Sequence, residues 1–224
     1  MTELQPIILS LELAAVTTAV LFVAAIPLAY LLAENNFKLK PVVSAVISMP
    51  LVLPPSVIGF YLLIAFSPAH FFGGIIEKAF NIRLVFSFQG LVLASVIYSL
   101  PFMVNPIQAG LESLPHSIKE ASYTLGKSKF KTLLKVLLPN IKPSLLTGIV
   151  LSFAHTIGEF GIVLMIGGNI PGKTRVASLA IYDEVESLNY HSANIYALTL
   201  FVLTFLILLT VYFINGRYLK AGRL

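Results

Sequence analysis

Long apolar stretches separated by short polar connections dominate the pattern of this chain. A helix needs about 20 apolar residues to cross the roughly 30 Å hydrocarbon core of a bilayer. Five stretches reach this length, and the charged side chains inside them are limited to Glu12, near one end of the first, and Glu159, well inside the fourth. We therefore predict an all-α integral membrane protein with five transmembrane helices, approximately Ile8–Leu32, Val42–Phe66, Phe88–Ala109, Ser144–Gly167 and Ile195–Asn215.

Two features modify this pattern of spans. The segment Ala69–Phe80 is too short and too interrupted to span, so we expect it in a loop, where it can lie as a helix along the membrane interface. Prolines interrupt the second and third spans, and each removes a helical hydrogen bond and favours a kink. Kinked segments can rock, although a static kink explains the same residues. These prolines are Pro50, Pro54, Pro55, Pro101 and Pro106.

Composition agrees with a membrane protein and narrows the classes of function. Of the 224 residues 57% are hydrophobic and 11% are charged, which is more apolar than the roughly half expected of a soluble domain. The chain has no cysteine, which excludes disulfides and thiolate chemistry. In a membrane protein, topology is the commoner reason for a net charge of +5, so no nucleic-acid partner is expected. We expect a single membrane domain over residues 1–224.

The distribution of basic residues predicts the orientation. Eleven of the 15 Lys and Arg residues follow spans one, three and five, and the other four follow spans two and four. Because basic residues resist export, the side with eleven is predicted to be cytoplasmic. The N-terminus then lies outside and the C-terminus inside. The four residues on the predicted outer side are Lys78, Arg83, Lys173 and Arg175.

The octet from Gly167 to Thr174 reads G-x-x-x-x-G-K-T, the pattern of a phosphate-binding loop. That pattern carries meaning only between a strand and a helix, whereas this octet follows an apolar helix on the predicted outer side. Pro171 also removes one of the backbone N–H groups that would bind phosphate. We therefore expect no nucleotide site here.

The longest predicted cytoplasmic loop, at about residues 111–142, contains a short helical pattern. Pro115 suits the first turn of a helix, and Gly126 suits its end. The loop resembles the hallmark of permease subunits of binding-protein-dependent ABC importers, which is E-A-A, three residues, G, nine residues, then I-x-L-P. This chain departs from it with Ser for the second Ala and Val for Ile. The matching residues are Glu120, Ala121, Ser122, Gly126, Val136, Leu138 and Pro139.

This resemblance implies a type I ABC importer permease in the cytoplasmic membrane, with a coupling helix that docks on a separate ATPase subunit. The chain itself would not be an enzyme and would bind no cofactor, because ATP and Mg²⁺ would be bound by the ATPase. The implied assembly contains two permease chains, two ATPase copies and one periplasmic or lipid-anchored binding protein.

The rest of the chain, from about Leu28 on, is similar to the molybdate permeases of the molybdate, tungstate and sulfate importer group. Gly158–Gly161 and Gly168–Arg175 fit molybdate better than sulfate. The resemblance therefore implies molybdate import, fed by a molybdate-binding protein. Tungstate and sulfate remain alternatives, because all three are tetrahedral dianions.

A translocated dianion requires weak contacts, since a deep site would retain it. The five spans contain no basic residue apart from His155. Small and hydroxylated residues are therefore candidates for the pathway, although helix packing by small residues explains them equally well. These candidates are Ser56, Gly59, Ser152 and Thr156.

His155 and Glu159 are the remaining candidates for the pathway or a gate. Their i, i+4 spacing predicts that they share one helix face and can hydrogen-bond to each other. A carboxylate repels a dianion, so Glu159 is expected to brace a gate or a dimer interface more than to bind substrate. No third ligand lies nearby in the sequence, so we expect no metal.

Two other classes of protein compete with this interpretation. A secondary carrier would use Glu159 or His155 as a proton relay, but one five-span unit lacks an inverted repeat, and a carrier has no use for a coupling motif. A membrane enzyme would need a nucleophile elbow, a carboxylate pair or clustered metal ligands, and none occurs in a plausible site.

Overall fold

The structure, a computed structural model, describes residues 4–221, with side-chain surroundings up to residue 213, and every regular element in this part is helical. The helices are α1 (Gln5–Glu34), α2 (Lys40–Ser48), the short 3₁₀ helix η1 (Met49–Leu51), α3 (Pro55–Phe66), α4 (Phe71–Phe80), α5 (Phe88–Glu112), α6 (His116–Thr124), α7 (Lys129–Thr132), the π-helix η2 (Leu133–Leu137), α8 (Leu138–Asn140), α9 (Lys142–Ile157), α10 (Gly161–Gly167), α11 (Ala177–Glu186) and α12 (Tyr190–Ala221).

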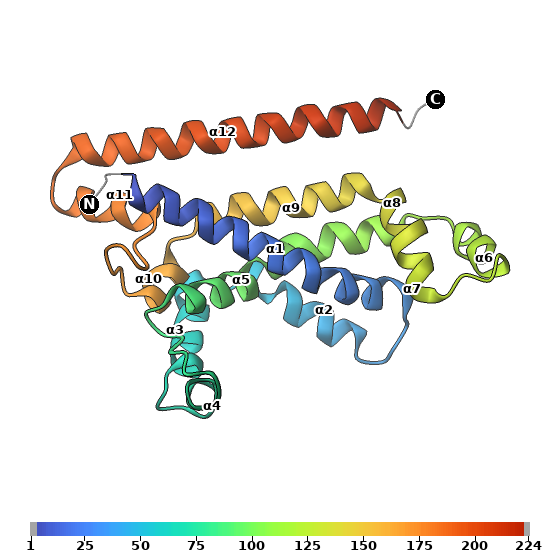
Figure 1. The fold of residues 1–224 in the computed structure, drawn as a ribbon, viewed down its shortest axis with the longest axis horizontal. Coiled ribbons are helices and arrows are strands. Elements are labelled where there is room, and N and C mark those ends of the chain that lie inside the picture. Colours follow the sequence, from blue (N-terminus) through green and yellow to red (C-terminus); the bar gives the residue numbers. More distant parts are fainter. Residues whose placement is uncertain (1–3, 222–224) are drawn as a thin grey trace.

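Three long helices, α1, α5 and α9, pack against one another and form the centre of the molecule, while α12 lies along one side (Figure 1). Within the described residues α1, α5 and α12 are each long and apolar enough to cross a bilayer alone. They cover the first, third and fifth predicted spans. The sequence pattern therefore located three of the membrane helices correctly.

The second predicted span, Val42–Phe66, is not one straight helix. The segment Lys40–Leu51 meets α3 at an angle of 110°. Pro54 and Pro55 explain the break, because a proline at the start of α3 has no N–H to donate and its ring would clash with a preceding helical turn. The prolines of this span predicted a kink, and the structure shows a sharper turn that sends α3 away from α2 (Figure 1).

The fourth predicted span, Ser144–Gly167, is also interrupted. Helix α9 ends at Ile157, residues 158–160 leave the helical path, and α10 begins at Gly161. At its other end, α9 meets the segment Lys129–Asn140 at an angle of 80°. Between residues 4 and 221 there are thus three helices that could each span a membrane, or up to five spans if each of the two sharply bent pairs counts as one.

Local sequence signals explain several helix ends. Ser87 precedes α5, and its hydroxyl accepts a hydrogen bond of 3.1 Å from the backbone N–H of Gly90. Gly90 is required there, because a Cβ would lie 1.8 Å from the carbonyl oxygen of Leu84. Helix α5 then continues through Pro101 and Pro106 without ending. The segment Ala69–Phe80, which we expected as a helix along the membrane interface, contains helix α4.

Two buried clusters divide the core along the bundle, and α5 contributes to both. The first joins α1 and α5 to α10 and α11, and it includes Leu13, Leu91, Ile162, Ile166 and Leu179. The second joins the other halves of α1 and α5 to η2, and it includes Leu21, Leu32, Met103, Ile107 and Leu137.

Candidate functional site

A cluster of polar side chains lies inside the bundle, where α5 faces the end of α9. The Ser95 hydroxyl donates a hydrogen bond of 3.1 Å to Oε2 of Glu159, and the Ser99 hydroxyl lies 2.9 Å from Nδ1 of His155. The predicted bond between His155 and Glu159 is wrong, because α9 ends at Ile157 and Glu159 no longer follows the helical path. Each of the two residues instead pairs with a serine of α5.

Glu159 connects three elements. Its side chain contacts Ser95 on α5, while its backbone carbonyl accepts a hydrogen bond of 2.7 Å from the hydroxyl of Ser178 on α11. The residue itself lies in the non-helical junction between α9 and α10. Its other carboxyl oxygen, Oε1, is buried and has no hydrogen-bond partner among the described residues. Glu159 therefore links α5 and α11 to the junction between α9 and α10, and its Oε1 remains a hydrogen-bond acceptor without a partner among the described residues.

Glu159 borders a groove of about 650 Å³. Ser56 contributes to the groove from the first turn of α3, and His155 contributes from α9. Two aromatic rings of α5 hold the His155 ring, with centroid distances of 4.9 Å to Tyr98 and 4.1 Å to Phe102. Three of the six residues predicted to form a pathway or gate thus border one groove.

The other three pathway candidates lie in helix packing. Ser152 and Thr156 are buried side chains of α9, where the Thr156 hydroxyl donates to the Ser152 carbonyl at 2.9 Å and lies 3.1 Å from the Ser99 hydroxyl on α5. Gly59 is buried against α10, because a Cβ there would lie 2.9 Å from Cβ of Met165. These contacts favour the packing explanation for all three residues.

Sequence reasoning missed the serines that complete the cluster. Ser95 and Ser99 are spaced i, i+4 within an apolar span, so both lie on one helix face. The same spacing separates His155 from Glu159, and this parallel was a usable signal. Ser178 carried no comparable signal, because its role depends on how α11 folds back onto the junction.

At the other end of the bundle, α6 contains the start of the predicted coupling motif. The predicted ends of this short helix are confirmed, since Pro115 directly precedes it and Gly126 lies just beyond its last turn. Gly126 has a φ of +72°, which favours glycine. The N–H of Lys127 bonds the carbonyl of Ser122 at 3.2 Å, and the N–H of Gly126 bonds that of Tyr123 at 2.9 Å. This pair of bonds is a Schellman motif.

Two buried contacts attach α6 to the bundle. Lys119 forms an ion pair with Glu34 at the end of α1, and the Ser122 hydroxyl lies 2.8 Å from the hydroxyl of Thr132 on α7. Ser122 is therefore buried within the chain, whereas Glu120 and Ala121 on the same helix are exposed.

The rest of the motif continues in the bent helical segment that leads to α9. Leu137 between the motif positions is fully buried. Of the matched residues, Val136 and Leu138 are half-buried and Pro139 is exposed. This half of the motif mainly anchors the segment to the core.

The octet that resembles a phosphate-binding loop has a different structure from one. It follows α10, an apolar α-helix, as predicted. The Thr174 hydroxyl is buried, donates to the carbonyl of Gly167 at 2.7 Å and accepts from the N–H of Ile170 at 2.9 Å. Both hydrogen bonds of the Thr174 hydroxyl stabilise the turn itself. The octet therefore forms a structural loop before α11.

The chain is similar in sequence to known proteins over nearly its whole length. The chain is 43% identical over 220 residues to the molybdenum transport system permease protein ModB of Azotobacter vinelandii, which covers 98% of the chain and 96% of that protein. It is 33% identical to the sulfate transport system permease protein CysT of Escherichia coli K12, over 85% of the chain and 69% of that protein.

Solved structures share its fold at lower identity. A bacterial ABC transporter involved in the import of alginate has a TM-score of 0.79 at 16% identity, over 97% of this chain and 80% of the other. The MetNI methionine ABC transporter has a TM-score of 0.72 at 18% identity, over 96% and 94%. Residues 25–221 match the family described as binding-protein-dependent transport system inner membrane component. The chain belongs to this family of multi-pass membrane proteins.

Proposed function

We propose that this chain is the pore-forming permease subunit of an ATP-driven importer that moves molybdate into the cell. The observation that carries the proposal is the 43% identity to a molybdenum permease over 98% of the chain. The sulfate permease matches with lower identity over less of the chain, so sulfate is the second candidate and tungstate, as a close analogue of molybdate, the third.

In this proposal α6 is the coupling helix and faces the cytoplasm, so that the N-terminus lies outside and the C-terminus inside. The exposed Glu120 and Ala121 dock on a separate ATPase, where Glu120 accepts charge-assisted hydrogen bonds. The ATPase binds ATP and Mg²⁺. Movement of α6 reaches α1 through the ion pair of Lys119 with Glu34, and it reaches α7 through Ser122.

The working assembly has two copies of this chain, two ATPase subunits and one extracytoplasmic molybdate-binding protein. On the outer side, Arg175 pairs with Asp183 at 2.9 Å, which holds the loop before α11 in place for a binding protein.

The groove beside Glu159 is the part of the pathway that this chain contributes. Ser56 offers a hydroxyl to a passing oxyanion without a fixed charge, which allows rapid release. Glu159 repels a dianion when ionised, so its role is to brace the junction of α9 and α10 through Ser95 and Ser178. A shift of this junction opens or closes the groove.

Uptake by the reconstituted complex tests the proposal. Vesicles containing the permease, its ATPase and its binding protein should accumulate labelled molybdate in an ATP-dependent manner, with sulfate accumulating more slowly. Faster sulfate than molybdate uptake, with each cognate binding protein supplied, would assign the chain to the sulfate branch. Uptake that needs an ion gradient and no ATPase would overturn the proposal.

A further inference from the structure

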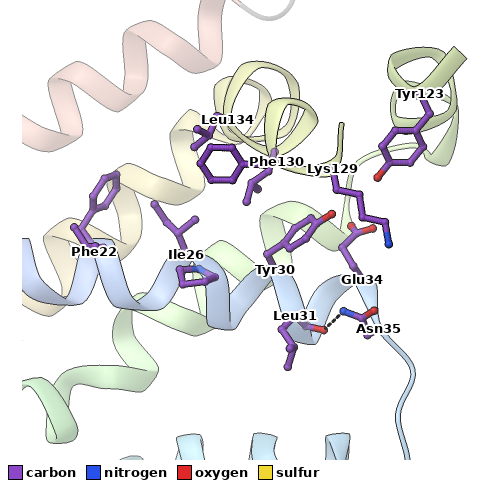
Figure 2. Close-up of a pocket in the computed structure, with 13 residues that line it drawn as sticks. Phe22, Ile26, Tyr30, Leu31, Glu34, Asn35, Tyr123, Lys129, Phe130 and Leu134 are labelled. Carbon is purple, nitrogen blue, oxygen red and sulfur yellow. Dashed lines mark hydrogen bonds between the residues drawn. The ribbon is translucent and has the colours of Figure 1, made fainter. Parts of the chain in front are cut away.

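A second hollow, larger than the groove at Glu159, lies on the surface between α1 and the segment that begins with α7. Its volume is about 930 Å³, near the upper end of the ~300–1,000 Å³ typical of ligand pockets. Figure 2 shows Glu34, Lys129 and Tyr123 gathered at one end, with Phe22 and Ile26 toward the other. The hollow is thus polar at the α6 end and apolar along α1.

The charge at the polar end is positive. Glu34 is already paired with Lys119, which lies outside the lining of the hollow. Lys129 is exposed and takes part in none of the ion pairs between described residues. The hydroxyls of Tyr30 and Tyr123 add hydrogen-bond donors at this end. The uncompensated charge is therefore a cation beside polar donors.

The apolar side of the hollow is not covered by the rest of the described chain. Val23 on α1 has 72% of its surface exposed, and Phe130 on α7 has 68%. In the proposed orientation this part of α1 runs through the inner half of the bilayer, and Lys129 lies at the level of the cytoplasmic headgroups. An occupant must then be apolar over most of its length and anionic at one end.

We propose that this hollow binds an anionic phospholipid of the inner leaflet, with one acyl chain along α1 and the phosphate at Lys129. Lipid tails are as apolar as the wall, so the acyl chain fills the space and the charge provides the selection. One basic residue near the membrane surface favours an anionic lipid by about 1 kcal/mol, or about fivefold. The bound lipid fastens α7 to α1 beside the coupling helix. This inference rests on the orientation in the proposed function.

Photolabelling of the complete complex in vesicles tests the site. A photoactivatable phosphatidylglycerol should label peptides containing Val23 or Phe130 about fivefold more than the matching phosphatidylcholine probe. Unlabelled phosphatidylglycerol should compete with it, and unlabelled phosphatidylcholine should not. This comparison needs no variant of the protein.

Two variants and two matched controls locate the label. Lys129→Gln should remove the preference for the anionic probe, and Val23→Trp should block labelling by filling the hollow. Lys135→Gln, on the adjoining helical turn, and Val20→Trp, one turn away on α1, change residues outside the lining and should leave the labelling unchanged.

Equal labelling by both probes, or labelling that both variants leave intact, would overturn the proposal. So would protection of these peptides in the assembled complex by a second copy of the chain or by the ATPase. Molybdate uptake in vesicles of phosphatidylcholine alone separates the two hypotheses. If uptake persists in these vesicles and the photoactivatable phosphatidylglycerol shows no preference over the phosphatidylcholine probe, the transport function stands and the lipid site is rejected.

Discussion

Lys119 on α6 forms an ion pair with Glu34 in the last turn of α1, and both side chains are largely buried, with 11% and 16% exposure. This contact joins the proposed coupling helix to the first membrane helix. A buried pair loses much of its stabilising effect in solvation, but removal of one partner leaves an uncompensated charge. The main effect of this ion pair is therefore to connect α6 to α1, and its contribution to the free energy of unfolding is secondary.

Replacement of Lys119 should uncouple the two helices. We expect Lys119→Met to lower substrate-stimulated ATPase activity and to reduce stability by about 1–3 kcal/mol, between the values for exposed and buried pairs. Glu34→Gln combined with Lys119→Met should recover part of the loss. Thermal unfolding of the purified complex measures the stability, and Lys127→Met, at an exposed position, is the control. Equal effects of Lys119→Met and Lys127→Met would show that the ion pair has no special role.

The left-handed conformation of Gly126 predicts a graded response. A Cβ there would meet no atom of the chain within 4 Å, so Gly126→Ala should cost only the backbone strain of about 1–2 kcal/mol. Gly126→Trp should abolish ATPase binding, because its bulk would collide with a docked partner at this turn. Binding of the ATPase to purified permease measures this. Normal binding of Gly126→Trp would contradict docking at this turn.

The exposed Glu120 should act on coupling without affecting folding. Glu120→Ala should weaken substrate-stimulated ATPase activity more mildly than Gly126→Trp, and it should leave the unfolding temperature of the isolated permease unchanged. Glu120→Gln should retain part of the activity, since the amide oxygen still accepts hydrogen bonds. Unchanged coupling in Glu120→Ala would remove this residue from the docking surface.

The junction at Glu159 should depend on its hydrogen bond with Ser95. Glu159→Gln keeps an acceptor for the serine hydroxyl and should retain most of the uptake, whereas Glu159→Leu should lose it. Ser95→Ala leaves a buried carboxyl oxygen without its donor, which costs about 1–3 kcal/mol. Initial rates of molybdate uptake at saturating binding protein test these variants. If Glu159→Gln lost uptake as fully as Glu159→Leu, the carboxylate itself would be required, as in a proton relay.

The absence of cysteine allows a direct test of orientation. A cysteine in place of Lys129 should react with a membrane-impermeant reagent only after the cells are opened, and one in place of Lys173 should react in intact cells. Both positions are exposed, so access through the protein is not limiting. The reverse pattern would overturn both the proposed orientation and the coupling role of α6.

The sequence predicted membrane helices where apolar length alone decides the structure, as in α1 and α5. At Pro54–Pro55 it predicted a kink but not how sharp the turn is, and it missed the break at residues 158–160, because a break inside an apolar run changes the path of the chain but hardly changes the hydropathy. The ends of α6 were predictable because Pro115 and Gly126 act through local backbone conformation.

The candidate site was only partly predictable. Glu159 is conspicuous as a carboxylate in an apolar run, but its partners Ser95 and Ser178 come from other elements, and no local pattern identifies them. Ser122 was interpreted as part of the docking motif, whereas tertiary packing against Thr132 turns it inward. Contacts between distant segments decided each of these cases.

The exposed stretch of α12 also has a consequence for how the chain responds to membranes of different thickness. A helix that contacts its own bundle mainly near α11 can change its tilt at little cost when the hydrocarbon layer thins or thickens. The packed helices α1, α5 and α9 have no such freedom. Mismatch between protein and bilayer should therefore be absorbed at the C-terminal helix, and the geometry around the buried carboxyl should be preserved.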